Sequence, residues 1–214
     1  MTDLSRNNLI HQPADDTWGA VSRAGAWCVT PRDVQDPSWL ERAAVQTFEA
    51  FAGLARVWRV SIGSIDPPDA LPAALEWHPS ASHRAFLDSI PTAIRSYPHA
   101  IYSVECSVDL FAFSRPAGPH TPPVQQWLRL NDDFRFWNGE DDDRSACFSL
   151  RHTLFCPASI DGLDNRELYE LNQPLLEHAL RRWEDRLGAI VEFEGFAGIY
   201  QYGFHPEPGA EMNR

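Results

Sequence analysis

Residues 100–113 read AIYSVECSVDLFAF, and their alternating pattern decides the fold expected for the chain. Successive side chains of a β-strand point to opposite faces of the sheet, so the pattern predicts a strand with one buried and one solvated face. Such one-sided burial is typical of antiparallel sheets. The apolar positions are Tyr102, Val104, Cys106, Val108 and Leu110, and the polar positions between them are Ser103, Glu105, Ser107 and Asp109.

Further strands are predicted before and after this stretch, from β-branched and aromatic runs bounded by turn residues. Three or four of them follow one another directly, which predicts an antiparallel meander. The last two flank a glycine-containing turn and predict a closing hairpin. The predicted strands, besides residues 100–113, are residues 26–30, 57–65, 125–130, 134–137, 146–154, 190–194 and 199–204.

Two amphipathic helices are predicted by apolar side chains that recur at intervals of three and four residues. The first begins at Ser38, with Glu41 as the reciprocal partner of a capping box. The second has the same arrangement at Asp164 and Glu167, and Gly188 is the expected stop.

A shorter helix is predicted over residues 82–90, with a kink or restart at Pro91. Helices alternate with strands, and the strands form a sequential group. This order predicts an α+β fold with a mainly antiparallel β-sheet and helices packed on one face.

The 214 residues are enough for one hydrophobic core, and we expect a single α+β domain over residues 17–206. Residues 1–16 are polar and lack a sustained period, so we expect a poorly ordered N-terminal segment. Residues 207–214 are expected to form a C-terminal tail.

The chain is acidic, with 18 arginines, no lysine and 30 carboxylates, which gives a net charge of -12. This charge disfavours nucleic acid, which needs a basic surface, and anionic membranes. It favours association with a basic partner, and the alternative interpretation is that the charge serves solubility alone. Because the chain has neither an apolar run of about 18 residues nor a signal-peptide core, we expect a cytoplasmic protein outside the membrane.

Four cysteines occur, at positions 28, 106, 147 and 156, and none is part of a C-x-x-C motif. This number is too small for a disulfide scaffold in a chain of this length. We therefore expect all four to be reduced and buried.

Sequence motifs for phosphate loops, dinucleotide binding, zinc proteases and serine hydrolases are absent, so no cofactor is expected. The eight histidines are dispersed, and no metal site is predicted. Cys106 and His152 share the apolar parity of two strands and are the candidates for a Cys-His nucleophile pair. The alternative interpretation is a core histidine beside an inert buried cysteine.

The most distinctive local feature is an acidic tract with aromatic residues inside it. Its spacing does not match a calcium-binding EF-hand loop. Aromatic anchors with charge around them suit a protein-binding surface. The alternative is a solvated hairpin tip whose aromatic side chains point into the core. The predicted partner-binding residues are Asp132, Asp133, Trp137, Glu140, Asp141, Asp142 and Asp143.

The chain resembles the immunity proteins of bacterial polymorphic toxin systems, which are small, acidic α+β domains. The resemblance rests on about 35 residues near the end of the chain: Trp183-Glu184, Glu194-Gly195, Gly198 and Tyr200-Gln201-Tyr202-Gly203-Phe204. It implies a non-catalytic protein that binds and neutralises one cognate toxin. The alternatives are an enzyme with an unfamiliar Cys/His hydrolase-like site and an accessory subunit of a bacterial assembly.

Overall fold

The structure is a computed structural model that describes residues 24–64, 73–116, 121–139, 144–158, 164–195 and 198–206. The predicted N-terminal segment 1–16 and C-terminal tail 207–214 lie outside the described residues.

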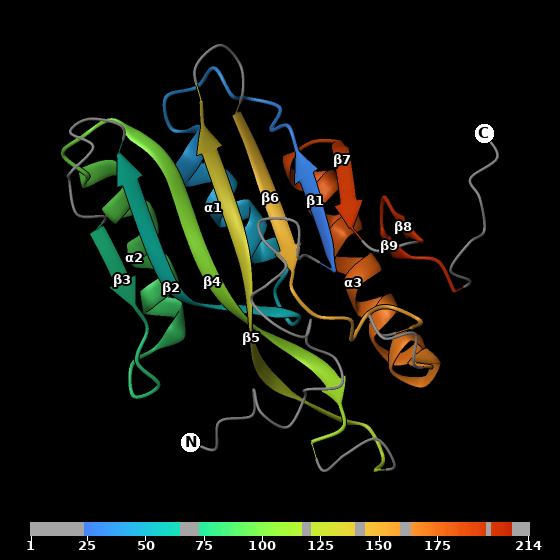
Figure 1. Ribbon diagram of the computed structural model, residues 1–214. Coiled ribbons are helices and arrows are strands. Elements are labelled where there is room, and N and C mark those ends of the chain that lie inside the picture. Colours follow the sequence, from blue (N-terminus) through green and yellow to red (C-terminus); the bar gives the residue numbers. More distant parts are fainter. Residues whose placement is uncertain are drawn as a thin grey trace.

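A seven-stranded sheet forms the centre of the molecule, in the order β3-β2-β4-β5-β6-β1-β7 (Figure 1). Every pair of neighbouring strands is antiparallel. The predicted meander is confirmed by β4, β5 and β6, while β1 lies between β6 and β7. The strands are β1 (Gly25–Val29), β2 (Ala55–Ser64), β3 (Ala73–Glu76), β4 (Ile101–Ser114), β5 (Val124–Asn138), β6 (Arg144–Leu150) and β7 (Ile190–Gly195).

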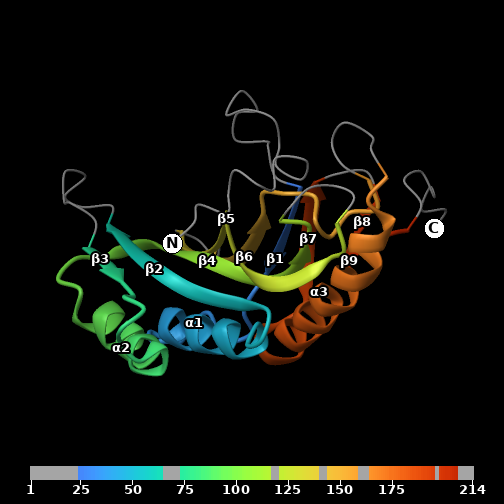
Figure 2. The ribbon, with the colours of Figure 1, turned by 90° about the horizontal axis from the view of Figure 1, so that it is seen from below.

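The helices α1 (Trp39–Ala50), α2 (His83–Ser96) and α3 (Arg166–Leu187) all cover the same face of the sheet (Figure 2). The predicted α+β class and the one-sided helix layer are therefore confirmed. Phe51, directly after α1, connects the helix layer to the sheet. Its ring centroid lies 4.9 Å from that of Phe134 on β5, 4.7 Å from that of Phe148 on β6 and 5.6 Å from that of Trp183 on α3. The aromatic contacts between these layers form the centre of the core.

The ends of the helices follow the prediction only in part. Ser38 precedes α1, but its side chain makes no capping bond; its N–H and hydroxyl both donate to Oδ1 of Asp36, at 2.8 and 2.7 Å. The capping box predicted there is wrong, because the carboxylate of Asp36 engages the hydroxyl. α2 continues through Pro91 as one helix. The capping box predicted at Asp164 and Glu167 is wrong, because Asn165 is the residue that directly precedes α3 and its side chain makes no capping bond. α3 ends at Gly188, as predicted.

β5 is one strand and not the two short strands predicted. It accommodates the acidic pair through a register shift, in which Val108 pairs with Asp132 and Asp109 pairs with Arg129. The two extra residues include Asn131, whose φ of 62° is in the left-handed region that asparagine tolerates. A bulge therefore replaces the predicted break between strands.

The C-terminal hairpin was also predicted wrongly. β7 pairs with β1, whereas β8 (Ile199–Tyr200) pairs with β9 (Gly203–Phe204) in a separate small sheet. The amide of Gln173 holds this small sheet: its Nε2 donates to the Tyr202 carbonyl at 3.0 Å, and its Oε1 accepts from the Phe204 N–H at 3.1 Å. β7 thus pairs with β1, which is distant in sequence, and the small sheet is bonded to α3, so the predicted local hairpin does not form.

Cys28 and Cys147 form a disulfide between β1 and β6, which corrects the expectation that all four cysteines are reduced. The two residues are directly opposite in the antiparallel register, with Cα atoms 4.1 Å apart. They are 119 residues apart in sequence, so no local sequence motif indicates that they form a disulfide. Cys106 and Cys156 are free and buried.

Among the described residues, none of the helices has both the length and the apolar composition that a membrane span requires.

Candidate functional site

The face of the sheet opposite the helices carries a charged row across three strands. Val108 and Leu110 are buried in the core on the helix side, so Asp109 between them points to the other face. The register places Arg56 of β2 and Arg129 of β5 on either side of Asp109. We call the side of the sheet that carries this row the polar face.

Asp109 bonds both guanidinium groups at once. Nη2 of Arg56 lies 2.8 Å from Oδ2, while Nε and Nη2 of Arg129 lie 2.8 Å from Oδ1 and 3.3 Å from Oδ2. The Asp109 side chain is only 5% exposed, whereas Arg56 is 25% and Arg129 is 44% exposed. One buried carboxylate therefore orients two partly accessible cations.

Three tryptophans complete the arrangement. The Cζ atom of Arg56 lies 4.3 Å from the ring centroid of Trp127 and 5.0 Å from that of Trp77, and the Cζ atom of Arg129 lies 3.9 Å from that of Trp58. Guanidinium groups at such distances are attracted by the π-faces of indole rings. The tryptophan–arginine cluster, as we name it, consists of Arg56, Trp58, Trp77, Asp109, Trp127 and Arg129.

Two irregularities in the strands position these side chains. The register of β2 against β4 shifts between Val57 and Arg59, at Trp58. The Trp58 carbonyl accepts the N–H of Trp77 at 2.8 Å, which holds the segment after β3 against β2. The indole Nε1 of Trp77 donates to the Ala81 carbonyl at 3.0 Å. The Trp77 ring is thus fixed by a bond to the backbone as well as by its contact with Arg56.

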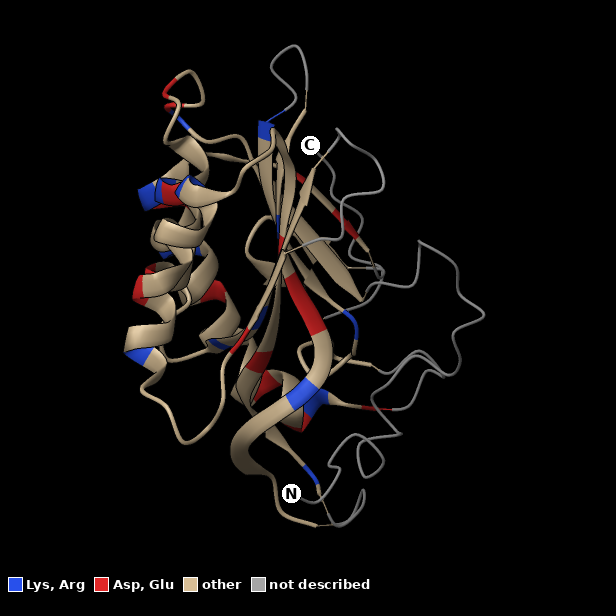
Figure 3. Cartoon of the chain, turned by 90° about the vertical axis from the view of Figure 1, so that its left-hand side faces the viewer, with Lys and Arg blue, Asp and Glu red and all other residues tan. Residues whose placement is uncertain are grey.

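A second charged group lies on the polar face beside the cluster. Asp133 lies 2.9 Å from Nη2 of Arg151 and 3.4 Å from Nε of Arg135, and Arg135 lies 3.8 Å from Glu105. With Asp109, Arg56 and Arg129, this group gives four guanidinium groups and three carboxylates. These named residues are therefore slightly basic in a chain of net charge -12. Figure 3 shows acidic and basic residues interspersed on both the sheet and the helices.

The predicted acidic surface is only partly described, and its described carboxylates are not on the surface. Asp132 is fully buried and Asp133 is 9% exposed, which corrects the expectation of an exposed pair. Both were misjudged because β5 continues through them and pairs with β4 and β6. Trp137 is half-buried, with its ring 5.4 Å from that of Tyr102. Glu140, Asp141, Asp142 and Asp143 lie outside the described residues.

His152, of the candidate nucleophile pair, lies after β6, which ends at Leu150, and not on the strand that was predicted to carry it. The Nε2 atom of His152 lies 3.0 Å from Oδ2 of Asp132, and both side chains are fully buried. Cys106 lies opposite Val60 and Phe134 in the sheet. Burial raises the pKa of the Cys106 thiol, and the negative charges of Asp133 and Glu105 raise it further. The neutral thiol is a poor nucleophile, so this cysteine has no activated form at neutral pH.

No group of three or more His, Cys, Asp or Glu side chains within the described ranges is arranged to hold a metal ion.

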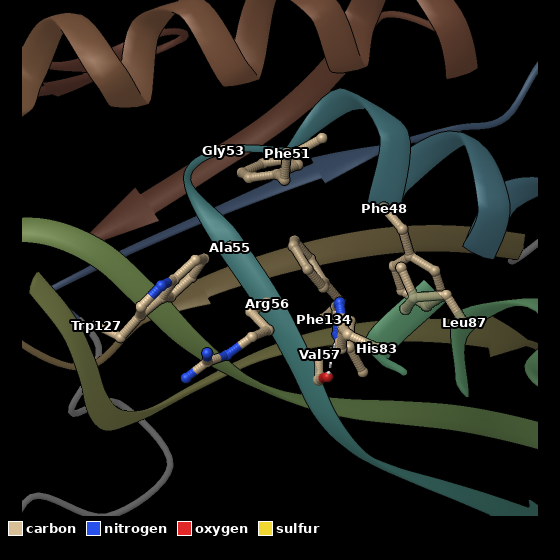
Figure 4. A pocket seen from close by; sticks show the side chains of 11 residues that line it. Phe48, Phe51, Gly53, Ala55, Arg56, Val57, His83, Leu87, Trp127 and Phe134 are labelled. Carbon is tan, nitrogen blue, oxygen red and sulfur yellow. Dashed lines mark hydrogen bonds between the residues drawn. The ribbon is translucent and has the colours of Figure 1, made fainter. Parts of the chain in front are cut away.

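A cavity of about 220 Å³ lies beside the tryptophan–arginine cluster, where α1 passes into β2 (Figure 4). Its lining is mainly apolar and includes three phenylalanines. Arg56 and Trp127 belong both to the cavity lining and to the cluster. The lining residues that matter for its chemistry are Phe48, Phe51, Phe134, Trp127, Arg56 and His83.

Sequence reasoning missed both the cluster and the cavity. The only available signal was the density of Trp and Arg in residues 56–59 and 127–129, which was interpreted as strand composition. Comparison of the chain with protein-family models, with curated proteins and with solved structures found no match.

Proposed function

We propose that this chain is a non-catalytic binding protein of the immunity class, which neutralises a cognate bacterial toxin by protein–protein contact. The observation that carries the proposal is the tryptophan–arginine cluster on the polar face. Tryptophan and arginine are the residues most enriched among the few that dominate the binding energy of protein interfaces.

The geometry of the cluster suits such a role because its long side chains are already fixed. Arg129 is held by Asp109 on one side and by the Trp58 ring on the other, and 44% of its side chain is exposed. A partner that contacts this guanidinium would not have to immobilise it. Side-chain ordering is one of the costs of association, so a fixed anchor raises the affinity for a given contact area.

The net charge of the chain sets the chemistry of the partner. A charge of -12 attracts a basic protein over long range and raises its association rate at low salt. The sequence Glu140-Asp141-Asp142-Asp143, between β5 and β6, is where the steering charge is most concentrated. Replacing the three aspartates by asparagine should slow association and weaken its dependence on salt, with little effect on thermal unfolding.

The deciding experiment uses products of genes adjacent to the one that encodes this chain. Each product is expressed alone and together with the full chain. The proposal expects one basic product that is lethal alone and harmless in co-expression. The dissociation constant of that complex is then measured for the native chain and for Trp58→Ala and Arg129→Ala.

Each cluster variant should weaken binding by about tenfold or more, as expected for a residue that dominates an interface. The matched control is Arg84→Ala, because Arg84 lies on α2 and its side chain is 78% exposed. This variant should bind as the native chain does. A toxic partner that binds all three variants equally would show that the cluster is not the contact surface, and the absence of any toxic partner would refute the immunity function.

A further inference from the structure

We propose that the Cys28–Cys147 bond is a reactive disulfide, which exchanges with small cationic thiols while the chain stays folded. The thiolate attacks the sulfur of Cys28, and Cys147 is the leaving group. This inference concerns a site of thiol modification and does not depend on the immunity function. It rests on the face of the sheet that carries the bond, on the position of the bond one strand from the sheet edge and on the charges beside it.

The disulfide lies on the polar face and not in the core. Trp27 and Phe148, its neighbours along β1 and β6, are fully buried on the helix side, with ring centroids 6.2 Å apart. Because side chains alternate along a strand, Cys28 and Cys147 point to the other face. Cys28 is partly exposed and Cys147 is 8% exposed, whereas the two free cysteines are at most 1% exposed. A reagent in solvent therefore reaches the disulfide before it reaches a free thiol.

The position of the bond in the sheet selects the sulfur that is attacked. A thiolate displaces one sulfur by approaching it from the side opposite the other, so access along that line decides the reaction. Cys28 and Cys147 are directly opposite on β1 and β6, so the line runs across the strands. The approach to Cys147 crosses β5, where Arg135 lies directly opposite it. The approach to Cys28 crosses only β7, the outermost strand (Figure 1).

At the β5 end of this line, the charges compensate one another. Arg135, opposite Cys147, lies 3.4 Å from Asp133 and 3.8 Å from Glu105. Arg151 lies 2.9 Å from Asp133, so two guanidinium groups face two carboxylates. This end therefore offers an incoming thiolate neither an open path nor a free cation.

At the β7 end, the charge is negative. Glu192 lies directly opposite Cys28, Glu194 follows two residues later on the same face, and both are exposed. Neither carboxylate forms a salt bridge with a cation within the described ranges. An anionic reagent is repelled from the path to Cys28, and a cationic one is attracted to it. The site therefore favours thiols that carry an ammonium group.

The exchange balances with the thiol as the only other reactant. A thiolate forms a bond to Sγ of Cys28, and the electron pair of the broken S–S bond goes to Cys147, whose thiolate takes a proton from water. A second thiolate attacks the external sulfur of the mixed disulfide and releases Cys28 as a thiolate, which is protonated in turn. The protein bond thus gains two electrons, and two thiols become one external disulfide. Because these steps are reversible, the occupancy of the bond follows the thiol–disulfide balance around the protein.

The test follows reduction of the purified full-length chain, in its disulfide form, by cysteamine, mercaptoethanol and mercaptoacetate, which are cationic, neutral and anionic thiols. Each rate constant is expressed per thiolate and divided by that for a small neutral disulfide, which removes intrinsic differences in nucleophilicity. We expect the cationic thiol to be about fivefold faster than the anionic one at low salt, and the ratio to fall as salt is added. The rate should not depend on urea below the unfolding transition, because the sheet does not have to open.

Glu192→Gln and Glu170→Gln form the matched pair of variants. Both glutamates are exposed, but Glu170 lies on α3, in the layer on the other face of the sheet. Glu192→Gln should lower the preference for the cationic thiol by about half, and Glu170→Gln should leave it unchanged.

The attacked sulfur is identified in two ways. Acid quenching followed by peptide mapping should find the mixed disulfide at Cys28. In Cys147→Ser, the free Cys28 thiol should react with cystamine about tenfold faster than the Cys147 thiol does in Cys28→Ser, because it is the more accessible of the two.

An adduct at Cys147, or reduction that accelerates steeply in urea below the transition, would overturn the proposal, because the folded chain would then protect Cys28. Equal normalised rates for the cationic and the anionic thiol would remove the selectivity. A chain in which cystamine does not form the bond would show that the two cysteines are not a redox pair. If a serine variant does not fold, the adduct mapping and the urea dependence of the native chain decide alone.

Discussion

His152 donates a hydrogen bond from Nε2 to Oδ2 of Asp132 across 3.0 Å, and neither side chain is exposed to solvent. The direction of this bond follows from the other ring nitrogen, since Nδ1 accepts the N–H of Leu154 at 3.3 Å. Oδ1 of Asp132 accepts the N–H of Arg151 at 2.8 Å. Asp132 thus ties the chain after β6 to the bulge in β5 and has a structural role.

Asp132→Asn should lower the free energy of unfolding by about 3 kcal/mol, because an amide N–H would face either a ring N–H or a backbone N–H in a buried site. Urea unfolding followed by circular dichroism measures the change. The control is Asp164→Asn, whose side chain is 78% exposed and which should change stability by no more than about 0.5 kcal/mol. Equal effects of the two substitutions would contradict the structural role of Asp132.

The Cys28–Cys147 disulfide should be detectable in the purified protein as two titratable thiols out of four in urea without reductant. Reduction should lower the free energy of unfolding by about 2–4 kcal/mol, because the unfolded chain loses a long covalent loop. The double variant Cys28→Ser/Cys147→Ser should be less stable by a similar amount and insensitive to reductant. Four free thiols under these conditions would mean that the protein folds without the bond.

Asp36 should make stability depend on pH at the low end of the range. Hydrogen bonds from the backbone and side chain of Ser38, and then one from Arg42, lower the pKa of this carboxyl from 3.8 to about 2. Its contribution is therefore complete above the unfolded pKa of 3.8 and is lost as the pH falls toward 2. The native chain should have a higher Tm than Asp36→Asn at pH 6, and the two values should converge near pH 2. A difference that stayed constant over this interval would refute the role of the carboxylate.

Gly203→Ala should destabilise the chain more than Gly53→Ala, although both glycines have positive φ, of 132° and 91°. A Cβ atom at position 203 would lie 2.2 Å from Nε2 of Gln173, whereas at position 53 nothing lies within 4 Å. Gln173 cannot move away without breaking its bonds to β8 and β9. We expect losses of about 3 kcal/mol for Gly203→Ala and about 1–2 kcal/mol for Gly53→Ala, measured by urea unfolding. Equal losses would indicate that the Gln173 amide is not rigid.

Features that depend on local pattern could be predicted from the sequence. The alternation in residues 100–113 correctly identified β4 and its buried parity, and the spacing of apolar residues before Gly188 identified α3. Burial on one side of an element repeats with the period of that element, so a short window contains the whole signal.

Features that depend on strand register could not be predicted. Arg56, Asp109 and Arg129 come together only because β2, β4 and β5 align in one particular register. The sequence around Asp132 predicted an exposed carboxylate, because aspartate is rarely buried without a partner. Its partner, His152, lies 20 residues away in the sequence and could not be recognised there. The pairing of Cys28 with Cys147 likewise depends on strand register, that of β1 against β6. A shift of one residue in any of these strands would turn these side chains to the other face.

The position of β1 between β6 and β7 has a consequence for folding during synthesis. β1 leaves the ribosome long before its first partner, β6, which follows more than a hundred residues later, as the 119-residue separation of Cys28 and Cys147 shows. Until then its backbone donors and acceptors have no native partner strand. Contacts of such high sequence separation slow folding. In the growing chain, the meander of β2, β4, β5 and β6 can form before β1 is paired, so β1 is exposed to wrong pairing for longer than these strands.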